Sequence, residues 1–210
     1  MITLFEYKTV KMPAEAEITE KKSRFISHIL PVTTESAATE FIASIKTKYW
    51  DASHNVYAYS LKDNNIRRYS DDGEPSGTAG MPTLDVICKE GLFDVCVVTT
   101  RYFGGTLLGA GGLVRAYTKA AKCGIDAAGI VKRVFCHEYS VRADYSLIGI
   151  IKNAAAAIGC IEGTPVYAED VTLKVFVPHT VTDFTDEIIG ATNGRAVITK
   201  ETEGRYMDAN

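Results

Sequence analysis

The segment DVCVVTTRYFGGTLLGAGGLVRAY, residues 94–117, contains the pattern that sets the architecture of this chain. Its first seven residues are an almost unbroken apolar run, which is typical of a strand buried on both faces. From Gly112 onward, Leu113 and Tyr117 share one face of a predicted helix. Five glycines lie between the strand and the helix. We therefore expect Arg101 at the carboxyl end of a buried strand and Gly112 near a helix N-terminus.

Regular elements are expected on both sides of this segment. β-Branched and aromatic residues predict strands at 24–32, 54–61 and 66–70. An apolar stripe with helical spacing follows Thr34, a suitable N-cap residue. From about residue 134 the pattern is strand, helix, two strands, helix and strand. This β-α-β-β-α-β order predicts a ferredoxin-like domain.

Length and charge indicate two domains. A chain of 210 residues fits one large or two modest domains. Residues 1–134 carry 17 Lys+Arg and 15 Asp+Glu, a net charge of +2, while residues 135–210 carry 6 and 11, a net charge of −5. The charge changes where the ferredoxin-like pattern begins. We therefore predict an α+β protein with domains at 1–132 and 133–210.

The composition excludes several classes of protein. A hydrophobic fraction of 46% with 23% charged residues is ordinary for a globular domain and unlike disordered or collagen-like chains. No stretch approaches the ~18 consecutive apolar residues of a membrane span, and the first residues lack a signal-peptide layout. The five cysteines are widely spaced and fit neither a disulfide framework nor a zinc site. We expect a cytoplasmic protein with reduced thiols, no membrane association and no cofactor.

The glycine-rich segment is the first candidate for a functional site. Glycines between a strand and a helix would let several backbone N–H groups point at one anion, and Arg101 and Arg115 would add charged hydrogen bonds to it. Neither standard phosphate-binding motif is present. A tight turn that allows close helix packing explains the same glycines, so both interpretations stay open. The candidate anion- or RNA-binding residues are Arg101, Tyr102, Phe103, Gly104, Gly105, Gly109, Gly111, Gly112 and Arg115.

The segment YSDDGEPSGTAGMP, residues 69–82, is the second candidate. Its three carboxylates and two hydroxyls are oxygen ligands of the kind that Mg²⁺ prefers, but an acidic turn with Asx-type hydrogen bonds explains them as well. His54 is either a general base beside this loop or a strand-end residue with a structural hydrogen bond. No catalytic residue and no metal-ligand set is assigned. The candidate residues of this second loop are His54, Asp71, Asp72, Glu74, Ser76 and Thr78.

Arginines alternate with aromatic rings at residues 67–69 and 101–103. This composition is typical of surfaces that bind single-stranded or loop RNA, where rings stack on bases and arginines contact phosphates. Further basic residues, Arg115, Lys119 and Lys122, follow on the predicted helix. A solvated, salt-bridged helix face is the alternative explanation.

Two motifs carry a resemblance to a known family. The segment RYFGGTLLGAGGLVRAY at 101–117 resembles the signature of the IMPACT family, whose bacterial members are the YigZ-type proteins. The segment SDDGEPSGTAG at 70–80 is similar to the second hallmark of that family. The resemblance covers about residues 18–128 and is weaker over 135–210.

This resemblance implies a fold and a class of partner. The family's N-terminal domain is similar to a two-layer α/β sandwich found in the second domain of a small-subunit ribosomal protein and in domain IV of elongation factor G. Its C-terminal domain is similar to the last domain of that factor, and its eukaryotic members regulate translation. The resemblance thus implies that both motifs form one site and that the protein binds RNA or a ribosomal or translation-factor surface. A magnesium-dependent enzyme or sensor for a small phosphorylated ligand and a protein-interaction module are the competing hypotheses.

Overall fold

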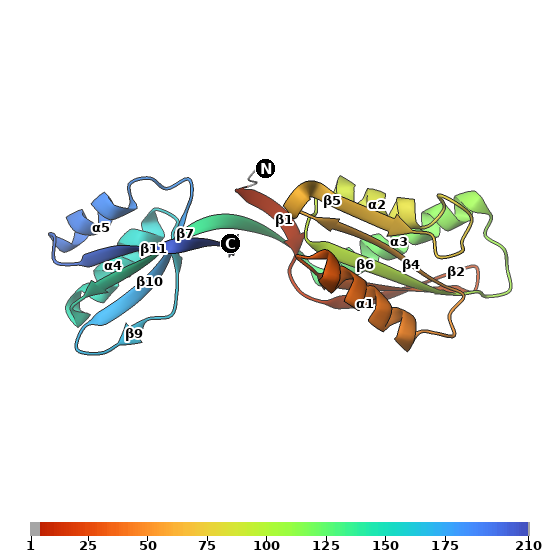
Figure 1. The fold of residues 1–210 in the computed structure, drawn as a ribbon, viewed down its shortest axis with the longest axis horizontal. Helices are drawn as coiled ribbons and strands as arrows, with labels where there is room; N and C mark the ends of the chain where they lie inside the picture. The colour runs from red at the N-terminus through yellow and green to blue at the C-terminus, as the bar shows by residue number, and fades with distance from the viewer. Residues whose placement is uncertain (1–4, 210) are drawn as a thin grey trace. The chain divides into compact units, whose positions relative to one another are not determined.

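The computed structural model describes residues 5–209 (Figure 1). The chain divides into two compact units, Met1–Lys132 (unit 1) and Arg133–Asn210 (unit 2). The described part contains five α-helices and two antiparallel sheets. The fold therefore mixes α and β structure, as the sequence predicts. In the described part, no helix is both long enough and apolar enough to span a bilayer.

A five-stranded sheet forms the centre of unit 1. β6 (Val95–Tyr102) is the central strand, and all of its residues except Tyr102 are buried. The predicted strands at 54–61 and 66–70 coincide with β4 (His54–Leu61) and β5 (Ile66–Ser70), because the local pattern of alternating residues marks both ends. The strand order is β2 (Ala14–Glu20), β3 (Ser23–Pro31), β6 (Val95–Tyr102), β4 (His54–Leu61) and β5 (Ile66–Ser70), with the single turn η1 (Asp63–Asn65) between β4 and β5.

Helices cover both faces of this sheet, so the expectation of a two-layer sandwich is wrong. α1 (Glu35–Lys48) packs on one face, and α2 (Gly80–Lys89) and α3 (Ala110–Ala128) pack on the other (Figure 1). The reason lies in β6, where Val97 faces α2 and α3 while Val98 faces α1. A strand that is apolar on both faces must be covered on both, which gives three layers.

The start of α1 follows the sequence prediction. Thr34 is its N-cap, and the Thr34 hydroxyl accepts a hydrogen bond from the backbone N–H of Ala37 at 3.2 Å. Near the N-terminus, β1 (Glu6–Val10) pairs with β7 (Ile130–Ala143), the long strand that runs from unit 1 into unit 2. The sequence pattern did not predict β1 or β2.

Unit 2 has the predicted β-α-β-β-α-β order, with its second strand broken into two short pieces. The elements after β7 are the turn η2 (Tyr145–Leu147), α4 (Ile148–Ala157), β8 (Ile161–Glu162), β9 (Val166–Tyr167), β10 (Val171–Pro178), α5 (Phe184–Thr192) and β11 (Val197–Ala209). In the sheet, β7 lies between β11 and β10, and both short strands pair with β10. Both helices pack on one face of this sheet, around Ile151, Leu173 and Ile188.

Candidate functional site

A cleft of about 390 Å³ in unit 1 brings parts of both sequence motifs together. The cleft is lined by His54, Gly73, Glu74, Pro75, Arg101, Phe103, Leu107, Leu108, Gly109, Ala110 and Leu113. These residues come from the start of β4, the loop after β5, the end of β6, the glycine loop and the first turn of α3. The register of the sheet explains part of the convergence, because His54 on β4 lies directly opposite Arg101 on β6.

A buried ion pair forms the floor of the cleft. Nη1 of Arg101 donates a hydrogen bond to Oε1 of Glu74 at 2.6 Å, and the Tyr117 hydroxyl donates to the same oxygen at 2.8 Å. The Arg101 guanidinium also lies over the rings of Phe25 and Phe103, 5.4 and 5.7 Å from their centres. Its Nε is buried and has no hydrogen-bond partner among the residues that the structure describes. The floor thus holds a positioned cation with one donor still unpaired.

Because it is buried, the Tyr117 hydroxyl stays protonated and donates its hydrogen bond to Glu74. The residue is fully buried on α3, and burial, with the adjacent charge of Glu74, raises the pKa of its hydroxyl far above the usual value. The hydroxyl therefore stays protonated and donates to the carboxylate. The sequence pattern placed Tyr117 on the apolar face of a helix and missed its part in this cluster. The available signal was that a fully buried tyrosine needs a polar partner for its hydroxyl.

His54 is oriented by the loop that follows β5. Its Nδ1 lies 2.8 Å from the backbone carbonyl oxygen of Asp72. A carbonyl oxygen only accepts, so Nδ1 carries the proton in this contact. In the neutral ring Nε2 is then unprotonated, and it lies 3.8 Å from Oε2 of Glu74. This arrangement fixes the orientation of the ring, with Nε2 on the side of the cleft carboxylate.

The N-terminus of α3 forms one edge of the cleft. Gly109 precedes the helix with φ of +71°, a conformation that favours glycine, and its carbonyl accepts the N–H of Leu113 at 2.9 Å. The N–H groups of the first helical turn, at residues 110–112, have no partner within the helix. These donors and the helix dipole favour an anion at this edge.

Other residues of the glycine motif lie outside the cleft. The backbone of Gly104 packs against Lys22 so closely that an added Cβ would lie 2.1 Å from the Lys22 carbonyl, and its N–H donates to Oγ of Ser23 at 3.1 Å. Tyr102 donates its hydroxyl to Oδ1 of Asp51 at 2.8 Å. Structural turns therefore explain this part of the motif.

Arg101 and Arg115 do not converge. Arg101 is buried at the cleft floor, whereas Arg115 is exposed on α3 and does not line the cleft. Gly105, with φ of +79°, also lies outside the lining. The lining of the cleft therefore gives no support to the idea that both arginines hold the same phosphate, which stays a prediction.

The three carboxylates of the second motif have separate partners. Asp71 accepts backbone N–H groups of Gly77, Ala79 and Gly80, which ties the loop to the start of α2. Asp72 pairs with the Lys46 ammonium and accepts the Asn55 N–H, each at 2.6 Å.

Glu74 alone of these carboxylates points into the cleft. The Thr78 hydroxyl donates to the Pro75 carbonyl at 2.6 Å, and Ser76 is exposed. Within residues 5–209, no group of three carboxylate, histidine or cysteine side chains is placed to hold a metal ion. The acidic-turn interpretation therefore fits Asp71 and Asp72, and the magnesium interpretation does not fit the arrangement of the donors.

Comparisons with known proteins match the part of the chain that contains this cleft. Residues 21–125, which span the cleft and both motifs, match the model of the Impact N-terminal domain. The chain is 43% identical over 207 residues to the IMPACT family member YvyE of Bacillus subtilis, covering 98% of this chain and 95% of that protein. It is 34% identical over 165 residues to the IMPACT family member YigZ of Escherichia coli, covering 75% and 79%.

A solved structure shares the fold along nearly the whole chain. It is described as the crystal structure of an hypothetical protein, and it matches with a TM-score of 0.61 and 28% sequence identity. The match covers 96% of this chain and all of the other. The extent of these similarities and the family match over both motifs show that this chain belongs to the IMPACT family.

Proposed function

We propose that this protein binds RNA, or an RNA surface of the translation apparatus, at the open end of the cleft and thereby modulates translation. The observation that carries the proposal is the pairing of an exposed ring with free amides. Phe103 is 49% exposed at the same cleft whose edge is formed by the start of α3, where the first-turn N–H groups have no partner within the helix and no N-cap side chain. A ring for a base and amides for a phosphate are what a single-stranded RNA needs.

The surroundings of the cleft supply charge for this role. Arg115 and Lys119 are exposed on α3, beyond the cleft edge. Lys122 is less available, because its ammonium pairs with Glu90 and Asp126 at 2.9 and 2.7 Å. We therefore assign backbone phosphate contacts to Arg115 and Lys119. Arg101 is buried at the cleft floor, where it contributes positive charge and not a contact with the RNA backbone.

Fluorescence anisotropy with a labelled single-stranded RNA of about ten nucleotides tests this proposal. Phe103→Ala should weaken binding by roughly tenfold or more, since stacking on one ring contributes ~1–3 kcal/mol. Arg115→Ala should weaken it and reduce the dependence of the affinity on salt by about one phosphate contact. Tyr167→Ala, which removes an exposed ring from unit 2, is the matched control. Affinity that is unchanged in both variants, or independent of salt, contradicts the proposal.

A second candidate function is the binding of a small phosphorylated ligand, and the volume of the cleft favours it. A cleft of about 390 Å³ falls within the range of small-molecule sites. Thermal shift assays with nucleoside monophosphates and sugar phosphates should then raise the melting temperature, and the ligand should displace RNA. Because the three carboxylates have other partners, this stabilisation should not require magnesium. Stabilisation without any RNA affinity would favour this candidate over the first.

A further inference from the structure

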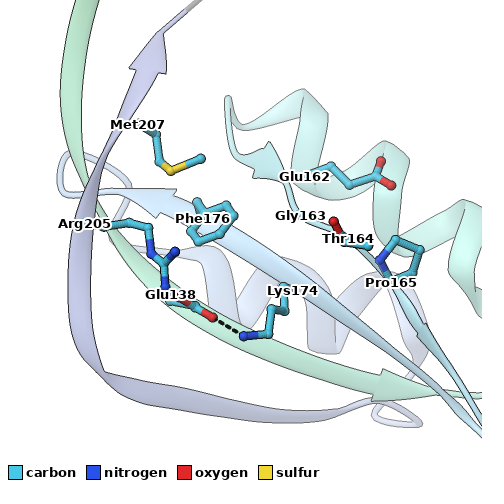
Figure 2. A pocket seen from close by; sticks show the side chains of 9 residues that line it. All are labelled: Glu138, Glu162, Gly163, Thr164, Pro165, Lys174, Phe176, Arg205 and Met207. Atoms are coloured by element: carbon cyan, nitrogen blue, oxygen red, sulfur yellow. Dashed lines mark hydrogen bonds and ion pairs between the residues drawn. The ribbon is translucent and has the colours of Figure 1, made fainter. Parts of the chain in front are cut away.

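A groove of about 620 Å³ lies in unit 2, far along the chain from both motifs (Figure 2). Its floor is formed by Glu138 of β7 with Lys174 and Phe176 of β10. Met207 and Arg205 of β11 stand on one side, and the loop between β8 and β9 stands on the other. On β10, Leu173 and Val175 face the helices. The groove therefore opens on the face of the sheet that α4 and α5 do not cover.

Two cations meet one buried carboxylate in this groove. The Lys174 ammonium donates to Oε1 of Glu138 at 2.6 Å, and Nη2 of Arg205 donates to Oε2 at 2.7 Å. The Glu138 side chain is 6% exposed, whereas the side chains of Lys174 and Arg205 are 46% and 60% exposed. An ammonium has three donors and a guanidinium has five. Both cations therefore have donors left for a solvent-side partner.

The local charge is positive in an acidic unit. Two cations against one carboxylate leave an excess of one positive charge, although residues 135–210 as a whole carry a net charge of −5. Glu162 also lines the groove, but its carboxylate is paired with Lys152. An anion in the groove would thus meet attraction from the cations and little repulsion from Glu162.

Packing of the fold does not explain Glu138. Its neighbours on this face, Cys136 and Phe176, belong to an apolar cluster. Replacing a buried ion pair with apolar residues often leaves a protein equally stable or more stable. What the carboxylate does is hold Lys174 and Arg205 together. The Arg205 guanidinium is also placed over the Phe176 ring, 5.3 Å from its centre. The cations are therefore positioned before any ligand arrives.

The loop wall is anchored directly to the floor. The Gly163 N–H donates to the Lys174 carbonyl at 2.8 Å, and a Cβ at Gly163 would lie 2.9 Å from Cβ of Lys174. Only glycine lets the wall approach the floor this closely. Pro165 follows in the same wall and adds an apolar surface opposite Met207.

We propose that this groove binds a small ligand with one oxyanion group, a carboxylate or a phosphate, attached to a flat apolar body. The oxyanion accepts hydrogen bonds from Lys174 and Arg205. The apolar body lies between Met207 and Pro165, above the apolar cluster to which the buried Phe176 belongs. All of these residues belong to unit 2, so the proposal does not depend on RNA binding by unit 1.

Glu138 competes with the ligand for the same cations. The hydrogen bond from Lys174 and the charges of both cations hold the pKa of Glu138 below its usual value against the opposing effect of burial. The carboxylate is therefore ionised at neutral pH. Glutamine keeps an amide oxygen that can still accept a hydrogen bond from the cations, but it removes the competing negative charge. Glu138→Gln should therefore bind the ligand more tightly than the unmodified protein.

NMR titration of the full, ¹⁵N-labelled chain tests the proposal with three probes: benzoate, phenyl phosphate and the uncharged benzamide. We expect saturable shifts of the groove amides with benzoate or phenyl phosphate and none with benzamide. The tighter of the two anions identifies the oxyanion. Lys174→Met and Arg205→Met should each weaken binding roughly tenfold, as expected for one charged hydrogen bond.

Lys200→Met is the matched control, because Lys200 is an exposed lysine of β11 whose ammonium lies over Tyr139, a residue packed with the helices. It should leave the affinity unchanged. Equal shifts with benzamide, no saturable shift with either anion, or unchanged binding in both methionine variants overturns the proposal. A Glu138→Gln variant that folds, as judged by its spectrum, but binds the anions no more tightly also counts against it.

Discussion

Each unit buries one glutamate against an arginine, but the two contacts differ in what surrounds the cation. In the cleft of unit 1 both Glu74 and Arg101 are buried. In the groove of unit 2 only Glu138 is buried, and its two cations are about half exposed. A closed pair is a requirement of the fold, because either partner alone would be an uncompensated buried charge. An open pair keeps its cations hydrated and accessible to a ligand.

The largest effect should come from breaking the closed pair. Glu74→Gln keeps the shape of the side chain but leaves the buried Arg101 charge uncompensated. We expect a loss of about 3–5 kcal/mol in the free energy of unfolding of unit 1. Urea titration followed by the amide NMR signals of unit 1 measures it, with the exposed Glu169→Gln as control. A loss below about 1 kcal/mol would mean that the pair behaves like a surface contact.

Tyr117→Phe should have the next largest effect. It removes the second donor to Glu74 without changing the packing of the ring against Phe25, whose centre lies 5.1 Å away. A hydrogen bond to a charged group contributes about 1.5–3 kcal/mol, so the same titration should show a loss of that size. Tyr69→Phe, at an exposed tyrosine of β5, should change the value by no more than about 0.5 kcal/mol. Equal losses in the two variants would mean that the hydrogen bond from Tyr117 to Glu74 does not stabilise the fold.

The open pair around Glu138 should make the stability of unit 2 depend on pH. The pKa of Glu138 in the folded protein lies below its ordinary value of 4.5. Its contribution to stability is therefore complete above that ordinary value and is lost as the pH falls toward the folded value. The unmodified protein should be more stable than Glu138→Gln at neutral pH, by less than the Glu74 effect, and the difference should shrink in acid. Melting temperatures of unit 2 across this pH range measure it; a difference that grows in acid contradicts the assignment.

The smallest effect is expected at Lys46. Its ammonium pairs with Asp72 at 2.6 Å, just outside the cleft, and the two side chains are 41% and 26% exposed. Surface pairs contribute about 0–1 kcal/mol, and solvent reaches both partners here, so Lys46→Ala should cost about that much in the urea titration. A larger loss would mean that this pair behaves like the buried pair of Glu74 and Arg101.

Local patterns predicted the elements of this fold well, but not its layers. β4 and β5 coincide with the predicted ranges because alternation and turn residues mark their ends within a few positions. The number of layers depends on which helix covers which face, and the apolar run of β6 was the evidence that both faces needed cover. β1 and β2 were missed because their charged and apolar residues form no run as clear as that of β6.

The candidate site was predicted at the level of loops and not of contacts. Both motifs do supply residues to one cleft. The partners of Asp71 and Asp72 come from α1, α2 and β4, and no spacing along the sequence indicates such contacts. Gly104 shows the same limit, because its need for a glycine comes from the backbone of Lys22 on another part of the chain.

The register between β4 and β6 has a kinetic consequence. The cleft floor joins residues that are 27 and 43 positions apart, and His54 faces Arg101 only when the two strands are paired in the native register. A slip by one residue would turn His54 toward the layer formed by α1. Long-range strand pairing is slow compared with helix formation. Binding competence should therefore arise late in refolding, and a ligand of the cleft would act as a selector for chains whose central strands have found the correct alignment.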